Sequence, residues 1–265
     1  MGLPSSFFSI SVPLATTRIV QVAQLVRAGG VIAIPTDTIY GLACSAHSIS
    51  ALKRIRKIKG RSLRKPMAIC LERVSSIPQV CDTHGLPDGL LSALLPGPVT
   101  VVLPRLRDDP LNRELNPNIN SFGVRVPDCG FVQKLLWALR ANQDPSLPDS
   151  DAADKDHPLV LTSANISGDM STLCVEEFRD IWPLLDLVVD GGPICSSVNS
   201  GETIARAGST IVDLCSVALR REYRVIRDGR LVIISILSGV WPLFFAVWCF
   251  LPLLNECIGE RRLLN

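Results

Sequence analysis

Hydrophobic and polar positions change their spacing repeatedly along the chain, which predicts alternating helices and strands. Between Thr17 and Gly29 the apolar residues recur every three to four positions, as in an amphipathic helix with Thr17 as its N-cap. A second such helix is expected after Ser48. Further helices are predicted at 90–95, 131–140 and 175–182, and strands at 31–35, 67–71, 99–103, 122–126, 159–162, 187–190, 210–214 and 224–226. Because the two kinds of element alternate through short turns, we expect one α/β domain with a twisted mixed sheet and flanking helices.

Two segments depart from this pattern. Residues 141–158 contain five aspartates and three prolines with little apolar content, which indicates an exposed acidic insertion loop. Residues 231–254 hold no charged residue and are long enough, at helical rise, to cross a hydrocarbon core of about 30 Å. A membrane anchor, a helix packed on the core or on a partner, and a divergent tail are alternatives for this segment. We therefore expect an N-terminal leader at 1–18, a domain at 19–230 and a hydrophobic tail at 231–265.

Composition narrows the class of protein. The formal net charge is only +2, so no strong attraction to nucleic acid extends over the whole molecule. The nine cysteines show no Cys-x-x-Cys spacing and none lies at zinc-ligand spacing from a histidine, which favours a reducing, intracellular compartment. The leader has no acidic residue and a single arginine, Arg18; an unstructured leader and a mitochondrial presequence are alternatives. The expected location is the cytoplasm, with the mitochondrion or a membrane as alternatives.

One short segment concentrates positive charge. The sequence Lys-Ile-Lys-Gly-Arg-Ser-Leu-Arg-Lys-Pro at 57–66 carries five basic residues and no acidic one. A basic loop of this kind suits a polyanionic ligand such as a nucleoside triphosphate. A solvated face or a nucleic-acid contact is the alternative interpretation.

Four further segments combine polar groups with tight turns. They are Pro-Thr-Asp-Thr-Ile-Tyr-Gly-Leu at 35–42, Pro-Gly-Pro-Val-Thr at 96–100, Gly-Val-Arg-Val-Pro at 123–127 and Leu-Thr-Ser-Ala-Asn-Ile-Ser-Gly at 161–168. In the first, hydroxyls and a carboxylate suit a small polar substrate, although Asp37 capping nearby amides is an equal alternative. In the third, Arg125 interrupts an apolar strand and requires an anionic partner. A substrate carboxylate or an internal aspartate would each satisfy it.

In this order, and together with Gly-Ser-Thr-Ile-Val-Asp at 208–213 and Ile-Arg-x-Gly at 226–229, these segments resemble the YrdC family of threonylcarbamoyl-AMP synthases. The resemblance extends from about 19 to 229. It implies a mixed α/β domain with a basic concave cleft. The implied reaction joins L-threonine, bicarbonate and ATP into threonylcarbamoyl-adenylate and releases pyrophosphate and water, with Mg²⁺ bound by the phosphates and no metal ligands from the protein. A separate threonylcarbamoyl-transferase complex would then modify adenosine in tRNA.

The resemblance also implies a role for individual residues. Lys59 and Arg61 would be the catalytic cations. ATP would be bound by Arg61, Lys65, Asn165, Ser171 and Arg227, and threonine by Thr38, Arg125, Ser163 and Ser209. Cys70 stands where many microbial members carry a histidine, and the chain beyond Gly229 does not resemble the family.

Other functions stay open at this point. The basic loop could belong to a module that binds double-stranded RNA or tRNA, although it contains no aromatic residue for base stacking. A carbamoyltransferase of the hydrogenase-maturation type would carry Cys-x-x-Cys modules, which this chain lacks. An inactive, membrane-tethered variant is a further alternative because of the unusual tail.

Overall fold

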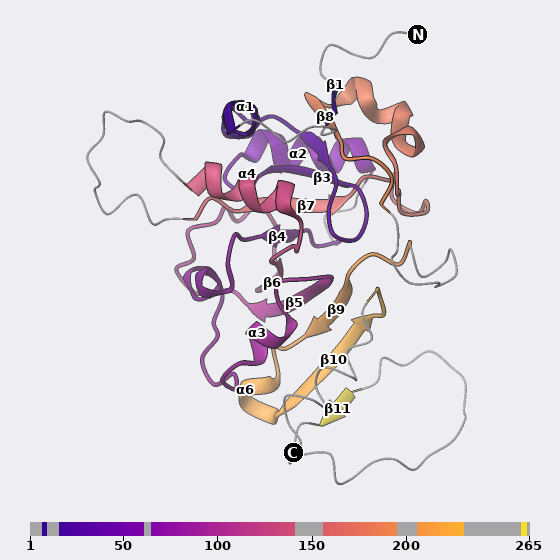
Figure 1. The fold of residues 1–265 in the computed structure, drawn as a ribbon. Coiled ribbons are helices and arrows are strands. Elements are labelled where there is room, and N and C mark those ends of the chain that lie inside the picture. The colour runs from indigo at the N-terminus through magenta and orange to yellow at the C-terminus, as the bar shows by residue number, and fades with distance from the viewer. Residues whose placement is uncertain are drawn as a thin grey trace, which may run out of the picture.

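The computed structural model describes residues 7–9, 16–60, 65–140, 156–194, 206–230 and 261–263. In this part of the chain, one eleven-stranded sheet carries helices on its faces, so the predicted mixed α/β domain is confirmed (Figure 1). The strand order is β1-β8-β2-β3-β7-β4-β6-β5-β9-β10-β11. The strands are β1 (Phe7–Ser9), β2 (Ile32–Ile34), β3 (Gly41–Ser45), β4 (Ala68–Cys70), β5 (Val99–Pro104), β6 (Ser121–Arg125), β7 (Leu159–Ser163), β8 (Leu187–Asp190), β9 (Thr210–Asp213), β10 (Glu222–Arg227) and β11 (Arg261–Leu263). The helices are α1 (Thr16–Arg27), α2 (Ile49–Lys59), α3 (Leu90–Leu94), α4 (Gly130–Arg140) and α6 (Val217–Arg220), with 3₁₀ helices η1 (Val74–Gln79) and η3 (Val175–Leu184).

Strand β7 brings the central segments of the sheet together. It pairs antiparallel with β3 on one side and with β4 on the other. Gly41 lies opposite Ser163 in the first pair, and Ala68 lies opposite Leu161 in the second. A Cβ at Gly41 would lie 2.6 Å from Leu161 Cδ1, so a larger residue would force the Leu161 side chain to move. The turn before β3, the start of β4 and the end of β7 therefore meet at one edge of the fold.

Helices cover both faces of the sheet. Helices α1 and α4 pack against one another and, with inward residues such as Ile32 and Leu159, form one hydrophobic core. Helix α2 covers the other face, where Leu52 and Ile55 are fully buried in a second, larger core. The predicted start of α2 after Ser48 is confirmed, and the Ser48 hydroxyl caps the helix by accepting a hydrogen bond from Ala51 N (3.3 Å). Helix α1 begins at Thr16, so Thr17 lies within the helix and is not its N-cap. The burial of one face of each helix accounts for the spacing of apolar residues in the sequence.

The structure differs from the sequence-based prediction at several elements. Strand β3 was not predicted, and residues 175–184 form a 3₁₀ helix interrupted at Phe178 (φ −126°, ψ 29°) instead of a regular α-helix. Strand β1 lies within the predicted leader and pairs with β8. Residues 141–155 of the predicted insertion loop and the whole of 231–254 lie outside the described residues. Among the helices that are described, none is long and apolar enough to span a membrane.

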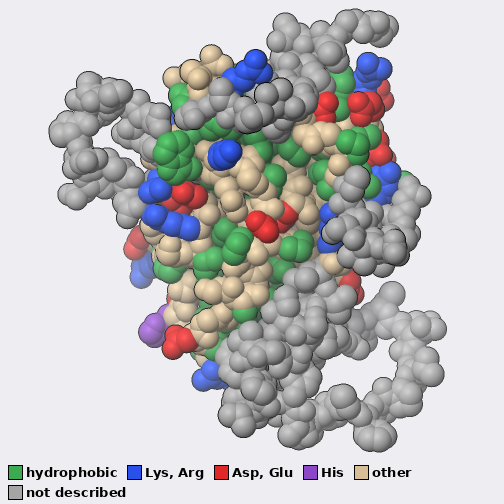
Figure 2. Space-filling model, in the orientation of Figure 1, with side chains coloured by type: hydrophobic (Ala, Val, Ile, Leu, Met, Phe, Trp, Pro, Cys, Tyr) green, Lys and Arg blue, Asp and Glu red, His purple; other side chains and the backbone are tan. Residues whose placement is uncertain are grey.

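Charged side chains of both signs are mixed on the face shown in Figure 2. Blue Lys and Arg side chains lie next to red Asp and Glu side chains at both edges of this view, with hydrophobic groups between them. This mixture agrees with the small net charge of the chain.

Candidate functional site

Six of the predicted site residues line one cavity of about 150 Å³. They are Thr38, Arg125, Ser163, Ser171, Ser209 and Arg227. They come from the β2–β3 turn, the ends of β6, β7 and β10, the loop before η3, and the residue before β9. The lining is completed by Thr36, Ile39, Gly41, Pro66, Met67, Ala68, Thr100, Leu161, Thr162 and Ile211. Segments up to 191 residues apart in the sequence therefore contribute hydroxyls and guanidinium groups to one site, since the lining extends from Thr36 to Arg227.

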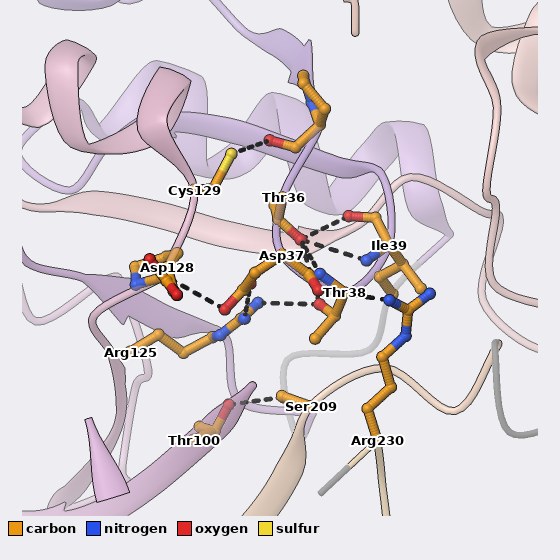
Figure 3. A network of polar contacts seen from close by, with 12 residues as sticks. Thr36, Asp37, Thr38, Ile39, Thr100, Arg125, Asp128, Cys129, Ser209 and Arg230 are labelled. Carbon is orange, nitrogen blue, oxygen red and sulfur yellow. Dashed lines mark hydrogen bonds and ion pairs between the residues drawn. The ribbon is translucent and has the colours of Figure 1, made fainter. Parts of the chain in front are cut away.

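The β2–β3 turn is held rigid by its own hydroxyls. Thr36 Oγ1 accepts hydrogen bonds from Thr38 N (3.1 Å) and Ile39 N (3.2 Å), and donates to Ile39 O (2.7 Å) (Figure 3). A Thr hydroxyl that bonds to amides two and three residues later closes a tight turn without a glycine. Behind the turn, the buried Tyr40 hydroxyl donates to Gly192 O (2.7 Å). Thr38 is thus presented to the cavity on a fixed backbone.

Arg125 has an internal carboxylate as its partner. Its Nη2 lies 2.5 Å from Asp37 Oδ1, and Asp37 Oδ2 accepts from Asp128 N at 3.1 Å. Of the two partners that the sequence allowed, the structure therefore supplies the aspartate. Nη1 makes a longer contact to Thr38 Oγ1 (3.4 Å), and Nε is buried with no hydrogen-bond partner among the described groups. A buried N–H donor without a partner costs free energy, which a ligand oxygen could recover.

A second guanidinium, that of Arg227, lines the same cavity. Arg227 donates from Nη2 to Ser209 O (2.7 Å), and the Ser209 hydroxyl lies 2.8 Å from Thr100 Oγ1 (Figure 3 shows the Thr100–Ser209 contact). Desolvation lowers the pKa of Arg227 from its ordinary value, and the positive charge of nearby Arg125 lowers it further. Two guanidinium groups that line one cavity make it suitable for an anionic ligand.

Glycine is required where β10 returns past β9. A Cβ at Gly229 would lie 2.3 Å from Thr210 N and 2.4 Å from the Ser209 carbonyl carbon. These are backbone atoms and cannot rotate out of the way, so only glycine allows the two segments to approach so closely. The Ile-Arg-x-Gly motif therefore has a structural explanation: its glycine lets Arg227 reach Ser209.

The Lys59 side chain donates hydrogen bonds to the backbone of the Ser-Ala-Asn turn. Lys59 is the last residue of α2, it is 1% exposed, and its ammonium group donates to the carbonyl oxygens of Ser163 and Asn165. Its own carbonyl accepts from Ser167 N (3.1 Å). Lys59 does not line the cavity, so its predicted catalytic contact with phosphate stays a prediction, whereas its role in shaping the turn is visible.

The Asn165 side chain also makes hydrogen bonds within this turn. Its Nδ2 donates to Ile166 O and Asp169 O, both at 2.8 Å, while its Oδ1 is buried without a partner among the described groups. The amide is therefore oriented by the turn, with one acceptor left for a ligand donor. Asn165 does not line the cavity, so its predicted contact with ATP remains a prediction.

For the other two predicted ATP-binding residues, Arg61 and Lys65, the structure gives less information. Arg61 lies outside the described residues. Lys65 is exposed and precedes Pro66, which lines the cavity. Within the described ranges no group of three or more His, Cys, Asp or Glu side chains could hold a metal ion. Binding of Mg²⁺ through the phosphates of ATP therefore stays a prediction.

Cys70 does not line the cavity. It pairs in register with Arg125 between β4 and β6, but its side chain belongs to the core under α1 and α4. Burial raises the pKa of its thiol to about 12, so the thiol stays protonated at neutral pH. An altered contact at Cys70, where many microbial members carry a histidine, stays a prediction.

Sequence reasoning missed two charged residues near the cavity. Asp37 was weighed only as a cap or general polar group, yet it is the carboxylate that pairs with Arg125. Arg230, one residue beyond the recognised motif, reaches from the end of the described domain toward the β2–β3 turn, where its Nη1 lies 3.4 Å from Asp37 O (Figure 3). Nothing in the local sequence marks Arg230, because its position depends on the return of the chain past Gly229.

Comparison with known proteins adds independent information. The family model described as Telomere recombination, for Sua5, YciO and YrdC, matches residues 24–229. The threonylcarbamoyl-AMP synthases of Bos taurus and Homo sapiens are each 45% identical to this chain over 208 residues. The match covers 78% of this chain but 66% of the bovine and 65% of the human protein, so the chain spans just under two thirds of their length.

Solved structures show the same fold. Pyrococcus abyssi Sua5 complexed with L-threonine is 25% identical, with a TM-score of 0.62 over 78% of this chain and 54% of that one. E. coli YciO is 24% identical, with a TM-score of 0.69 over 86% of this chain and 98% of its own. The second likeness supports the architecture alone, whereas the first also concerns a protein with bound threonine.

Proposed function

Because this chain belongs to the Sua5/YciO/YrdC family, we propose that it is a threonylcarbamoyl-AMP synthase. It would convert L-threonine, bicarbonate and ATP into threonylcarbamoyl-adenylate, pyrophosphate and water. The proposal is supported by the name of its mammalian relatives at 45% identity. From the chain itself, one observation carries it: six residues that the motifs assign to ATP and threonine converge on a single cavity.

The threonine half of the site follows from Arg125. Its guanidinium is 6% exposed and lines the cavity, and its Nε–H has no partner among the described groups. A substrate carboxylate would supply a charge-assisted acceptor for this donor, while Asp37 keeps the guanidinium in place. The hydroxyls of Thr38 and Ser209 lie on the same cavity and would bond the polar groups of threonine. The bound L-threonine in P. abyssi Sua5 agrees with this assignment for a protein of the same fold.

The chemistry requires alignment and charge stabilisation. The threonine amine attacks the carbon of bicarbonate, and water leaves to give a carbamate. A carbamate oxygen then attacks the α-phosphorus of ATP as the bond from that phosphorus to the bridging oxygen of pyrophosphate breaks. The departing pyrophosphate gains charge, which Arg227 and the basic loop residues Arg61 and Lys65 would stabilise. ATP enters as its Mg²⁺ complex, so the ion arrives with the substrate.

The product would leave for a second enzyme. Threonylcarbamoyl-adenylate is a mixed anhydride, an activated acyl group that a separate transferase complex could pass to adenosine in tRNA. The cytoplasm, with the mitochondrion as an alternative, and membrane association through 231–254 remain expectations from the sequence.

The direct test is incubation of the full chain with ATP, Mg²⁺, L-threonine and bicarbonate. Pyrophosphate release is recorded, and the adenylate is detected at once by mass spectrometry. We expect both signals to require threonine and bicarbonate. Release of pyrophosphate that ignores threonine would contradict the proposal. Threonine-dependent turnover would also exclude the inactive-variant alternative, and it would not be expected of a protein that only binds RNA.

A further inference from the structure

Arg206 and Glu177 form a charged pair beside the cavity. Arg206 Nη1 lies 2.8 Å from Glu177 Oε2, and Nη2 lies 2.9 Å from Oε1. Two parallel N–H···O bonds fix the plane of the guanidinium as well as its distance. The side chains are 18% and 30% exposed, so solvent screens them only in part. The hydrogen bonds from Arg206 lower the pKa of Glu177 below its usual range, although burial opposes this effect.

Both members of the pair hold the backbone of one cavity wall. Arg206 Nη1 also donates to Ser171 O (2.8 Å), and Glu177 Oε2 accepts from Leu173 N (2.9 Å). Between these two contacts, Thr172 O accepts from Tyr40 N (2.9 Å). Each of the three consecutive residues 171–173 is therefore attached to a neighbouring element, and the first of them, Ser171, lines the cavity.

The same arginine is close in sequence to a second part of the cavity lining. Arg206 lies three residues before Ser209, whose hydroxyl contacts Thr100 and lines the cavity. Gly208, between them, has φ +72°, in the left-handed region that favours glycine. The guanidinium of Arg206 thus joins the segment that carries Ser171 to the segment that carries Ser209.

We propose that Arg206 and Glu177 are positioning residues that set the spacing between the Ser171 and Ser209 walls. The inference rests on the proposed function, in which Ser171 faces ATP and Ser209 faces threonine. Neither Arg206 nor Glu177 lines the cavity, so both act through the backbone they hold. Loss of the pair lets the two walls move independently, which weakens binding of both substrates more than it changes the chemical step.

The chain offers a matched control pair. Arg140 at the end of α4 bonds to Glu72 (Nε to Oε2, 2.6 Å), with side chains 22% and 18% exposed, and neither residue lines the cavity. Alanine variants of Arg206, Glu177, Arg140 and Glu72 are compared in KM, kcat and Tm. For Arg206→Ala and Glu177→Ala we expect both KM values to rise about three- to tenfold, with kcat changed less. Arg140→Ala and Glu72→Ala should lower Tm by similar amounts and leave KM unchanged.

A double variant and an exchange measurement complete the test. Arg206→Ala combined with Glu177→Ala should raise KM by less than the product of the two single changes, because the Arg206–Glu177 contact is lost in each of them, whereas the contacts to Ser171 O and Leu173 N are lost separately. Hydrogen–deuterium exchange at Leu173 should be faster in these variants and unchanged in the control variants. Equal KM changes in both pairs, or unchanged exchange at Leu173, would overturn the proposal. Faster exchange in a chain that shows no threonine-dependent turnover would support the pair and refute the proposed function.

Discussion

Replacing Arg125 by lysine isolates what its planar guanidinium contributes. Lysine keeps a positive charge beside Asp37. It therefore avoids the cost of about 3–5 kcal/mol that a buried carboxylate without a partner would carry. Lysine lacks the Nε–H donor and the planar set of N–H groups that lets arginine donate to two partners at the same time. Arg125 is 6% exposed, so solvent cannot replace the lost donor. The change therefore removes one charge-assisted hydrogen bond to the proposed threonine carboxylate and preserves the local ion pair.

The expected size follows from that single bond. A hydrogen bond to a charged group contributes about 1.5–3 kcal/mol, which corresponds to roughly a 10- to 150-fold rise in the KM for threonine. The KM for ATP should change much less. Pyrophosphate release is measured against threonine concentration at saturating ATP and bicarbonate, with Tm recorded for each variant.

Arg105 provides the control on the neighbouring strand. It is also a buried arginine, 8% exposed, and it is paired with an aspartate: Nε lies 2.9 Å from Asp109 Oδ2. It lines no part of the cavity. Arg105→Lys should therefore lower Tm as Arg125→Lys does, and leave the threonine KM unchanged. A threonine KM within twofold of wild type in Arg125→Lys, or an equal rise in Arg105→Lys, would refute the assignment.

Three further changes test other contacts. Lys59→Gln should lower Tm as well as turnover, because the Ser-Ala-Asn turn loses its buried cation; unchanged Tm would argue against the positioning role. Gly229→Ala should cost about 1–3 kcal/mol in denaturant unfolding, since its Cβ meets backbone at 2.3 Å; wild-type stability would refute the clash. Burial, with His47 and Arg27 nearby, lowers the pKa of His157 to about 4, below its unfolded value. Stability is therefore full above pH about 6.5 and falls by about 1–3 kcal/mol toward pH 4, after allowance for partial exposure; His157→Gln should flatten this profile, and an unchanged profile would contradict it.

Local periodicity was sufficient for elements that bury one face. Helix α2, for example, was predicted to begin after Ser48, because the apolar stripe that follows is a local signal. Strand β3 was missed because its five residues, Gly-Leu-Ala-Cys-Ser, are short, mostly small and buried without alternation. Its partner β7 begins more than a hundred residues later, and no local sequence pattern predicts that pairing.

The site was predictable to a similar extent. The motifs identified residues that meet in the cavity, but they could not decide between two partners for Arg125, because Asp37 lies 88 positions away. They also gave no sign that Lys59 points inward beneath a turn instead of outward toward solvent. Spacing along the chain identifies candidate groups, whereas burial and long-range pairing determine which of them remain available to a ligand.

The central place of β7 limits how this protein can tolerate changes in length. All five of its residues pair with β3, and the first three, Leu159 to Leu161, also pair with β4, so the register with one neighbour cannot shift without disturbing the other. One extra residue inside 159–163 would turn every later side chain of the strand to the opposite face. Ser163 would then leave the cavity although no functional residue had been replaced. An insertion scan across this strand should therefore abolish turnover at sites where conservative substitutions are tolerated.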